Sequence, residues 1–488
     1  MLFNSLKFLL FFPIVTIIYF ALPHKFRWVH LLIASCIFYM AFVPVYILIL
    51  FTTIIIDYIA GILIEKSEGS KRKLWLIASI AANVGILGFF KYYNFFSFNV
   101  NALFSSTHIN ANIPILKLIL PIGLSFHTFQ AMSYTIEVYL DNQKAERHLG
   151  IYALYVMFYP QLVAGPIERP QNLLHQFHER HKFEYGNVAS GLRLMLWGMF
   201  KKVVIADRLA LFCDPVFNDP KGYSGIVLAL AAFIFVFQIY CDFSGYTDIA
   251  IGAARVMGFK LATNFNRPFS SRSISEFWRK WHISLSSWFF DYVYNPLVFS
   301  LRSWGMKFSI IFSFFVTFFL SGFWHGAGWN FIIWGVMQGA VPLTFEFLTK
   351  SKRQKIFGRL PKWLNDNLSM CFTFSYLVII NVLFRVNHLR DALVIYDKFL
   401  SIPRELMLLC TRRNTMFLNL PDGITTILPC FGLILFLEIF QLIQVRVQKI
   451  KSFDQIGVFY RWGLYYCGIA AIYFFGVYDN HQFIYFQF

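Results

Sequence analysis

The stretch "FSIIFSFFVTFFLSGFWHGAGWNFIIWG", residues 308–335, decides the fold class of this chain. It opens with a long apolar run that carries no charged residue, and it then places one ionisable side chain, His325, among three glycines. Apolar segments of about 20 residues cross bilayers as helices. A glycine-rich break at membrane depth is tolerated only where it is buried in protein or lines a cavity. The stretch therefore predicts membrane-embedded helices with an irregular break at His325.

The composition extends this prediction to the whole chain. Of its 488 residues, 58% are hydrophobic and 20% are aromatic, whereas soluble domains contain about 45–50% apolar residues. We predict an all-α polytopic membrane protein, a single domain over residues 1–488, with roughly 10–12 transmembrane helices plus re-entrant or interfacial helices. The first span is expected to be retained rather than cleaved as a signal. The candidate spans are 8–23, 29–44, 45–64, 74–92, 115–140, 150–165, 188–212, 225–253, 308–321, 329–348, 368–385, 423–444 and 459–477.

The distribution of charge predicts the orientation. A net charge of +18 is typical of nucleic-acid binding, but Lys and Arg in a membrane protein mark cytoplasmic loops. Basic residues cluster at 65–73, 350–362 and 446–451, and residues 101–112 carry no charge. We therefore expect the three basic loops in the cytosol, and 101–112 and the C-terminal residues 477–488 outside. This describes a multi-pass protein of the cytoplasmic (inner) membrane, in contact with lipids and not with nucleic acid.

Metal-ligand patterns are weak in this chain. The seven cysteines include no C-x-x-C pair, which argues against a disulfide framework and against a zinc site. His175, His178 and His181 recur every three residues, a spacing that spreads them around a helix instead of directing them at one ion. We read these histidines as a solvated face, and we predict no bound metal and no bound cofactor.

Polar residues at membrane depth concentrate between about 120 and 340, which we predict to be the catalytic core. In "PIGLSFHTFQAMSYTIEVYLD" (121–141), one helical face carries His127, Gln130, Tyr134, Glu137 and Asp141. Polar groups are costly in lipid, so this face should line protein interior or water. Two explanations fit this stripe equally well: a substrate tunnel and a structural hydrogen-bond network between helices.

Two further segments carry polar residues at helical spacing. Gln238 and Asp242 lie four residues apart in "QIYCDFSGYTDIAIG" (238–252). In "SRSISEFWRKWHISLSSWFFDYVYNPL" (271–297), Ser273-x-x-Glu276 is a capping box that predicts a helix start. We expect one amphipathic, aromatic helix that ends at Pro296 and lies in or re-enters the membrane interface. His282 on this helix is equally explained as a packing residue.

His325 combines a titratable ring with apolar surroundings. A neutral imidazole accepts a proton from a hydroxyl at physiological pH, which suits a general base worth about 10²–10⁴ in rate. A packing histidine or a member of a proton relay fits the same pattern. Gly335 and Gly339, four residues apart, predict a face for close helix packing nearby.

Four motifs resemble the membrane-bound O-acyltransferase family. They are "QLVAGPIERP" (161–170), "QIYCDFSGYTDIAIG" (238–252), "NFNRPFSSRSISEFWRKWHISLSSW" (264–288) and "SGFWHGAGWNFIIWG" (321–335). The likeness is greatest to the bacterial polysaccharide branch, which includes the membrane component of alginate O-acetylation and relatives in peptidoglycan O-acetylation. It is dense over about 120–340 and looser elsewhere. The resemblance implies a catalytic base at His325, a second histidine at His282, and helices around a central tunnel.

The resemblance also implies the reaction. Acetyl-CoA would supply an acetyl group from the cytosol, and the acceptor would be a hydroxyl of an extracytoplasmic polysaccharide, reached directly or through a partner acetyltransferase outside the cell membrane. His325 and His282 are the expected catalytic residues. Residues expected to line the path of the donor or substrate are His127, Gln130, Glu137, Gln238, Asp242, Arg279, Lys280, Trp281, Trp324 and Asn330.

Two other functions fit the same residues. One is O-acyl transfer to a lipid or to a teichoic-acid type of carrier, which differs only in donor and acceptor. The other is a proton-coupled transporter in which His127, Glu137 and His325 relay protons, and it predicts flux without consumption of acetyl groups.

Overall fold

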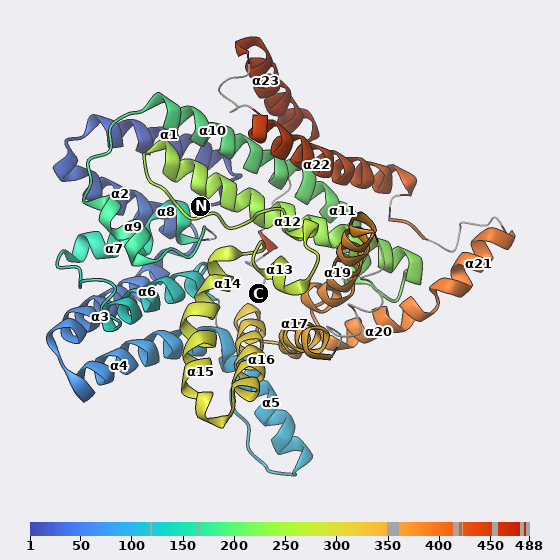
Figure 1. Cartoon of the computed structure of the whole chain (residues 1–488), viewed down its shortest axis with the longest axis horizontal. Coiled ribbons are helices and arrows are strands. Elements are labelled where there is room, and N and C mark those ends of the chain that lie inside the picture. Colours follow the sequence, from blue (N-terminus) through green and yellow to red (C-terminus); the bar gives the residue numbers. More distant parts are fainter. Residues whose placement is uncertain are drawn as a thin grey trace. The chain divides into compact units, whose positions relative to one another are not determined.

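A computed structural model describes residues 1–117, 120–163, 165–348, 361–412, 419–421, 423–450, 457–478 and 483–484. These residues form helices and connecting segments without a β-strand, which confirms the predicted all-α class (Figure 1). Three predicted orientation markers fall wholly or partly outside the described residues. They are most of the loop 350–362, the last residue of 446–451, and most of the C-terminal segment 477–488.

Most of the long α-helices overlap the predicted apolar runs, and several shorter helices lie between those runs. Their bounds are α1 Leu6–Ala21, α2 His24–Met40, α3 Ile47–Lys66, α4 Gly69–Leu87, α5 Tyr93–Ser106, α6 Leu124–Tyr139, α7 Leu149–Met157, α8 Tyr159–Leu162, α9 Pro170–Leu173, α10 Tyr185–Met199, α11 Asp207–Asn218, α12 Gly225–Val256, α13 Ile274–Trp278, α14 Ile283–Phe289, α15 Asn295–Ser300, α16 Met306–His325, α17 Trp329–Leu348, α19 Lys362–Arg385, α20 Leu389–Leu400, α21 Ile402–Arg412, α22 Ile424–Ile450 and α23 Val458–Phe475. Three π-helical turns join neighbouring helices at Gly88–Tyr92, Phe200–Ala206 and Phe290–Tyr294.

The described residues divide into two compact units. Unit 1 comprises 1–195 and 246–263, and unit 2 comprises 196–245 and 264–488. Helices α10 and α12 each contribute residues to both units. The predicted catalytic core over 120–340 therefore draws on both units, and the single domain over 1–488 stays a prediction.

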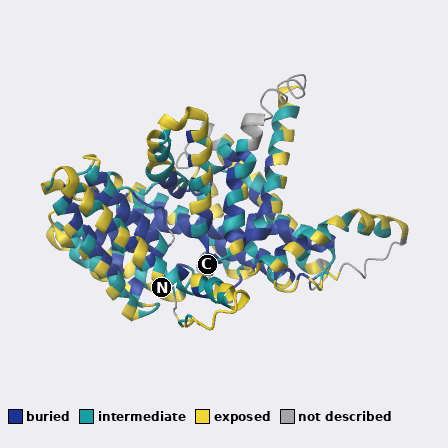
Figure 2. Ribbon diagram, turned by 90° about the horizontal axis from the view of Figure 1, so that it is seen from below, coloured by how far each residue is buried: buried dark blue, intermediate teal, exposed yellow. Residues whose placement is uncertain are grey.

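Six described helical segments are long and apolar enough to cross a membrane: Pro44–Lys66, Gly69–Ser106, Gly225–Val256, Met306–His325, Lys362–Arg385 and Thr425–Arg446. The apolar helix Leu6–Ala21 is shorter. Multiple apolar spans make the chain a multi-pass membrane protein, as predicted. The total of 10–12 crossings stays a prediction. Figure 2 shows buried residues along the inner faces of the helices and exposed residues on their outer faces, where lipid would contact apolar side chains.

Two predicted helices of unit 1 differ from the structure in where they break or end. The span 150–165 is divided into α7 and α8, because Pro160 has no backbone N–H to continue a helix. The polar stripe on α6 ends at Glu137, since the helix stops at Tyr139. Asp141 lies beyond it with a left-handed φ of 61°, and its exposed carboxylate pairs with Arg72 at 2.5 Å.

A buried polar clamp holds α3 and α4 of unit 1 together. The carboxylate of Asp57 is fully buried and accepts hydrogen bonds from Asn83 Nδ2, at 2.9 Å to each of its oxygens. Ser79 Oγ donates to the same carboxylate at 2.6 Å. Such interhelical bonds satisfy polar groups that lipid cannot solvate. The clamp fixes the helices against which α6 packs.

The hairpin of α16 and α17 in unit 2 depends on backbone contact. A Cβ added at Gly322 would lie 2.5 Å from the carbonyl oxygen of Phe331 and 2.8 Å from the Cα of Gly335. A Cβ added at Gly335 would lie 2.5 Å from the carbonyl oxygen of Phe318. Neither position accepts a side chain, so the predicted close packing of small residues near His325 is confirmed.

Candidate active site

His325 is the last residue of α16, and Gly326 leaves the helix in an extended conformation. The chain turns over 326–328 and enters α17 at Trp329. A Cβ added at Gly326 would collide with the ring of Phe331, so the turn accepts only glycine there. The glycine-rich break is thus a tight turn at the tip of a helical hairpin, and it places His325 beside the start of the next helix.

The imidazole of His325 lies in an aromatic enclosure and is only 5% exposed. Its ring centroid lies 4.9 Å from that of Trp324, 5.1 Å from that of Trp334 on α17, and 5.3 Å from that of Phe384 on α19. All three rings meet it nearly edge-on. Exclusion of bulk water strengthens the electrostatic interactions of a reacting group at this position.

His282 corrects the prediction of one long helix over 271–297. The helix begins as the capping box predicts, with Ser273 Oγ accepting from the backbone N–H of Glu276 at 3.1 Å, while Glu276 Oε2 accepts from the N–H of Arg272 at 2.8 Å. The helix α13 nevertheless ends at Trp278, and His282 adopts a left-handed conformation with φ 42° before α14 begins. Pro296 lies inside α15 and does not end the segment.

The break at His282 exists because another segment satisfies its backbone. The carbonyl oxygen of Asn264 accepts from the N–H of Ile283 at 2.9 Å, and Asn264 Oδ1 accepts from the N–H of Ser284 at 3.2 Å. These donors open α14 and have no partner within their own helix. Long-range capping therefore outweighs the local helical periodicity of the sequence.

Asn264 also sets the tautomer of His282. Its Oδ1 receives a backbone N–H and the hydroxyl of Ser284, at 2.9 Å, so this atom is the amide oxygen. The Nδ1 of His282 lies 3.1 Å from it and must therefore carry the proton. Nε2 is then the acceptor nitrogen of the ring. Burial lowers the pKa of His282 from 6.5 to about 3, which keeps the imidazole neutral.

Trp324 links the two histidines within unit 2. Its ring centroid lies 4.9 Å from that of His325 and 6.4 Å from that of His282. The ring of His282 also meets Phe243 of α12 edge-on, at 4.7 Å. The structure therefore brings the two predicted catalytic histidines and Trp324 into one buried aromatic cluster.

Three other predicted residues lie near this cluster in the sequence but have different surroundings. Trp281 is buried and stacks on Phe277 at 5.5 Å. Lys280 pairs with Glu276 at 2.7 Å, and Arg279 is exposed at the end of α13. Arg279 therefore has the more accessible charge of the predicted basic pair.

Asn330, Gln238 and Asp242 are buried in unit 2. Asn330 Nδ2 donates to two backbone carbonyls at the end of α19, at 3.1 and 3.0 Å. Asp242 pairs with Lys202 Nζ at 2.5 Å. These contacts of Asn330 and Asp242 hold helices and segments together, and their proposed place along a substrate path stays a prediction.

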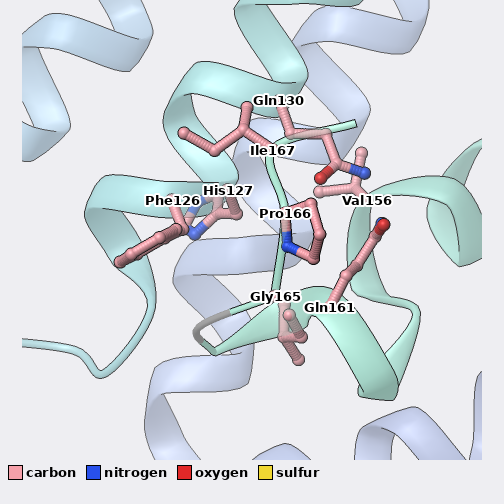
Figure 3. Close-up of a pocket in the computed structure, with 9 residues that line it drawn as sticks. Phe126, His127, Gln130, Val156, Gln161, Gly165, Pro166 and Ile167 are labelled. Atoms are coloured by element: carbon pink, nitrogen blue, oxygen red, sulfur yellow. The ribbon is translucent and has the colours of Figure 1, made fainter. Parts of the chain in front are cut away.

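The predicted residues His127, Gln130 and Glu137 belong to α6 in unit 1. Figure 3 shows His127 and Gln130 facing a narrow pocket with Gln161, Gly165 and Pro166. Gln130 Nε2 and Gln161 Nε2 both donate to the carbonyl of Tyr155, at 2.6 and 2.8 Å. The pocket leaves no room for a water molecule. It is a packed polar contact of α6 with α7, α8 and the segment 165–167.

Glu137 lies on α6 seven residues after Gln130, about two helical turns beyond that pocket. Its Oε2 accepts from Gln171 Nε2 at 2.6 Å and from Asn142 Nδ2 at 3.0 Å. The contacts of Glu137 are those of a structural hydrogen-bond network, which was one of the two explanations for the polar stripe. A tunnel role for this residue stays a prediction.

The three histidines at 175–181 have separate partners. His178 Nε2 lies 2.8 Å from Glu146 Oε2, and His181 Nε2 lies 2.8 Å from the carbonyl of Gln176. His175 Nε2 lies 3.8 Å from Glu179. Each ring is directed at a different group.

Comparisons with known proteins identify the family. A family model described as "MBOAT, membrane-bound O-acyltransferase family" matches residues 146–385. The chain is 34% identical over 417 residues to the peptidoglycan O-acetyltransferase of Helicobacter pylori, covering 80% of this chain and 76% of that protein. It is 36% identical over 406 residues to a probable alginate O-acetylase of Pseudomonas aeruginosa, covering 82% of this chain and 75% of that protein. The chain belongs to the membrane-bound O-acyltransferase family.

This membrane-bound O-acyltransferase also resembles a teichoic acid D-alanyltransferase of Bacillus subtilis. That similarity is 29% identity over 284 residues, covering 55% of this chain and 70% of that protein. The family assignment confirms the resemblance found in the sequence and makes the chain an O-acyltransferase. The family match at 146–385 includes His282 and His325 but not His127, Gln130 and Glu137.

Two features of the acyltransferase site were missed in the sequence. Asn264 stands eighteen positions before His282, and no local pattern reveals that it orients the ring. Lys202 is different, because a lysine within the predicted apolar span 188–212 is a recognisable signal of a buried polar site. Its Nζ lies 2.8 Å from Asp207 and 2.5 Å from Asp242 in unit 2.

Proposed function

We propose that this acyltransferase takes an acetyl group from acetyl-CoA on the cytosolic side and transfers it to hydroxyls of an extracytoplasmic polysaccharide, directly or through a partner acetyltransferase. The observation that carries this proposal is the buried cluster in which His325 and His282 both contact Trp324. The names of the relatives from Helicobacter pylori and Pseudomonas aeruginosa support acetyl as the group and a polysaccharide as the acceptor.

His325 acts as the general base in this proposal. The acceptor hydroxyl oxygen attacks the thioester carbonyl carbon, and His325 takes the hydroxyl proton as the new C–O bond forms. The C–S bond breaks, coenzyme A leaves as a thiolate, and the thiolate takes up the proton that His325 holds. The products are the acetyl ester and the free thiol. Attack requires the acceptor oxygen within about 2.6–3.2 Å of the base, or one bridging water.

His282 assists by orientation. Its Nδ1 proton is held by Asn264, so Nε2 presents a lone pair. A lone pair on a neutral ring accepts a hydrogen bond from a hydroxyl and aligns it for attack. The ring is fully buried, which keeps it neutral at physiological pH.

The proposal is tested with membranes that contain the protein, acetyl-labelled acetyl-CoA and the cell's own polysaccharide. Label that is released from the polysaccharide by mild base as acetate supports the proposal. Transfer of D-alanine, with no transfer of acetate, would favour the carrier chemistry of the teichoic acid relative. Proton or solute flux without consumption of acetyl-CoA would favour the transporter.

The orientation gives a prediction about labelling. In a variant without the native cysteines, a cysteine at Ser70 should react with an impermeant thiol reagent only after the membrane is opened, because the basic loop 65–73 should be cytosolic. A cysteine at Ser105 should react in intact cells. Ser70 and Ser105 are both exposed, so the protein itself leaves the reagent equal access to the two positions. Strong labelling of Ser70→Cys in intact cells would reverse the orientation.

Arg279 gives a prediction about donor binding. Its exposed guanidinium suits the phosphates of a coenzyme A donor, so Arg279→Ala should raise the KM for acetyl-CoA several-fold with little change in kcat. Arg272→Ala is the matched control, because it removes an arginine that pairs with Asp366 at 3.2 Å. An unchanged KM in Arg279→Ala would indicate that this side chain contacts lipid phosphates instead.

A further inference from the structure

Val477, Phe483 and Ile484, near the end of the chain, are buried in unit 2. The backbone N–H of Val477 donates to the carbonyl of Val203 at 2.9 Å. The backbone N–H of Ile484 donates to Asp242 Oδ2 at 2.8 Å. Phe483 is 1% exposed, and Ile484 is 7% exposed. Residues about 240 positions apart in the sequence are thereby held together at α12.

The anchor at Asp242 is a buried charge cluster. Lys202 Nζ bridges Asp242 at 2.5 Å and Asp207 at 2.8 Å, so one ammonium faces two carboxylates. The backbone N–H of Ile484 donates to Oδ2 of Asp242, whereas Lys202 lies against Oδ1, so both oxygens of this carboxylate have a donor. Hydrogen bonds to charged groups are among the stronger ones in proteins. The position of Ile484 is therefore well defined by its backbone.

Fixing Ile484 also fixes its neighbour Phe483 against the site. The ring centroid of Phe483 lies 5.5 Å from that of Phe243 on α12. Phe243 is fully buried and meets His282 edge-on at 4.7 Å, with an interplanar angle of 86°. The three rings form a contiguous row, and Asn264 contacts His282 through Nδ1. The imidazole is thus held by a hydrogen bond at one atom and by aromatic packing at its ring.

We propose that Phe483 is a positioning residue for His282, which it holds through Phe243 without touching substrate. This inference rests on the proposed function, because its readout is acetyl transfer. Phe483 stands far from every acyltransferase motif in the sequence, outside the family match at 146–385. Small displacements of a group that orients a reactant reduce kcat steeply, by up to about 10²-fold for 1 Å.

The first test is Phe483→Ala in the full chain, purified from membranes and assayed with acetyl-CoA and polysaccharide. We expect kcat to fall roughly tenfold, because the aromatic support of His282 is lost. The KM for acetyl-CoA should change less than about twofold, because the substitution removes no contact with the donor. Phe483→Leu should recover most of the kcat, since it refills the space. Phe475→Ala is the matched control, because that phenylalanine is 61% exposed on α23. If Phe483→Ala is not recovered from membranes, Phe483→Val replaces it, with kcat expected below that of Phe483→Leu.

A double-mutant cycle tests the route through Phe243. Phe243→Leu should lower kcat, and Phe243→Leu combined with Phe483→Ala should lower it no further than the more severe single variant, because both act on one row of rings. Losses that multiply would overturn the inference, as would a wild-type kcat in Phe483→Ala. Failure of the proposed function is distinguishable, since the wild-type protein would then consume no acetyl-CoA, and that outcome would overturn both proposals.

Discussion

Replacing His325 by alanine is expected to lower polysaccharide acetylation by about two or more orders of magnitude, the scale of general-base catalysis. The ring sits at the end of α16 inside an enclosure of Trp324, Trp334 and Phe384, and its removal leaves no imidazole at that position. His325→Gln should lose as much, because an amide keeps a hydrogen bond but cannot take up the proton. The measurement is acetate released from polysaccharide by mild base, normalised to the amount of protein in the membrane.

His388→Ala is the matched control for this prediction. His388 is an exposed histidine that precedes α20 and makes no capping bond with its side chain, so its loss should leave acetylation unchanged. A well-expressed His325→Ala strain with near-wild-type acetylation would remove His325 from the mechanism. The proton-relay explanation would then require a separate test by flux.

Replacing His282 by asparagine is expected to lower kcat by about ten- to a hundredfold, less than the loss at His325, because orientation contributes less than proton transfer. Asparagine is the informative substitution, since it tolerates the left-handed φ of 42° better than alanine does. The control is His108→Asn, which makes the same exchange at an exposed residue with φ 56°. If His282→Asn and His108→Asn lower kcat equally, the loss of kcat reflects a change in folding.

The buried ring of His282 also predicts a pH dependence. Burial lowers its pKa from 6.5 to about 3 in the folded protein. Above pH 6.5 the ring is neutral in both the folded and the unfolded chain, so it does not affect the free energy of unfolding. As the pH falls from 6.5 toward 3, the unfolded chain binds a proton that the folded chain does not, and stability falls. His282→Asn should reduce this loss in acid unfolding experiments.

The helices were predictable from the sequence because apolar runs and basic loops act locally. The spans around α3, α12 and α16 lie within four residues of their predicted bounds, whereas the span predicted at 74–92 extends over Gly69–Ser106. The helices that were predicted wrongly end or break at long-range contacts or at turns. A stripe of polar residues in the sequence does not reveal either. Asn264 breaks the helix at His282 because it accepts a hydrogen bond from the backbone N–H of a residue twenty positions away. The helical periodicity of the sequence does not indicate this contact.

The two histidines of the candidate site were predictable from the sequence, but the residues that surround them were not. His282 and His325 stand in motifs that carry the family resemblance, and the structure places both against Trp324. A helical stripe shows which residues share a face, but it does not show which bundle that face enters. His127, Gln130 and Glu137 lie on α6 in unit 1, and their place along a substrate path stays a prediction.

The backbone contact between Gly322 and Gly335 has a consequence for motion. A Cβ at either position would lie 2.5 Å from a carbonyl oxygen of the facing helix, so the two backbones already touch and have no slack for sliding. We therefore expect the hairpin of α16 and α17 to move as one piece. Any opening that admits a substrate to His325 has to come from the elements that face the hairpin. The candidates are α19, which carries Phe384, and the broken segment at His282.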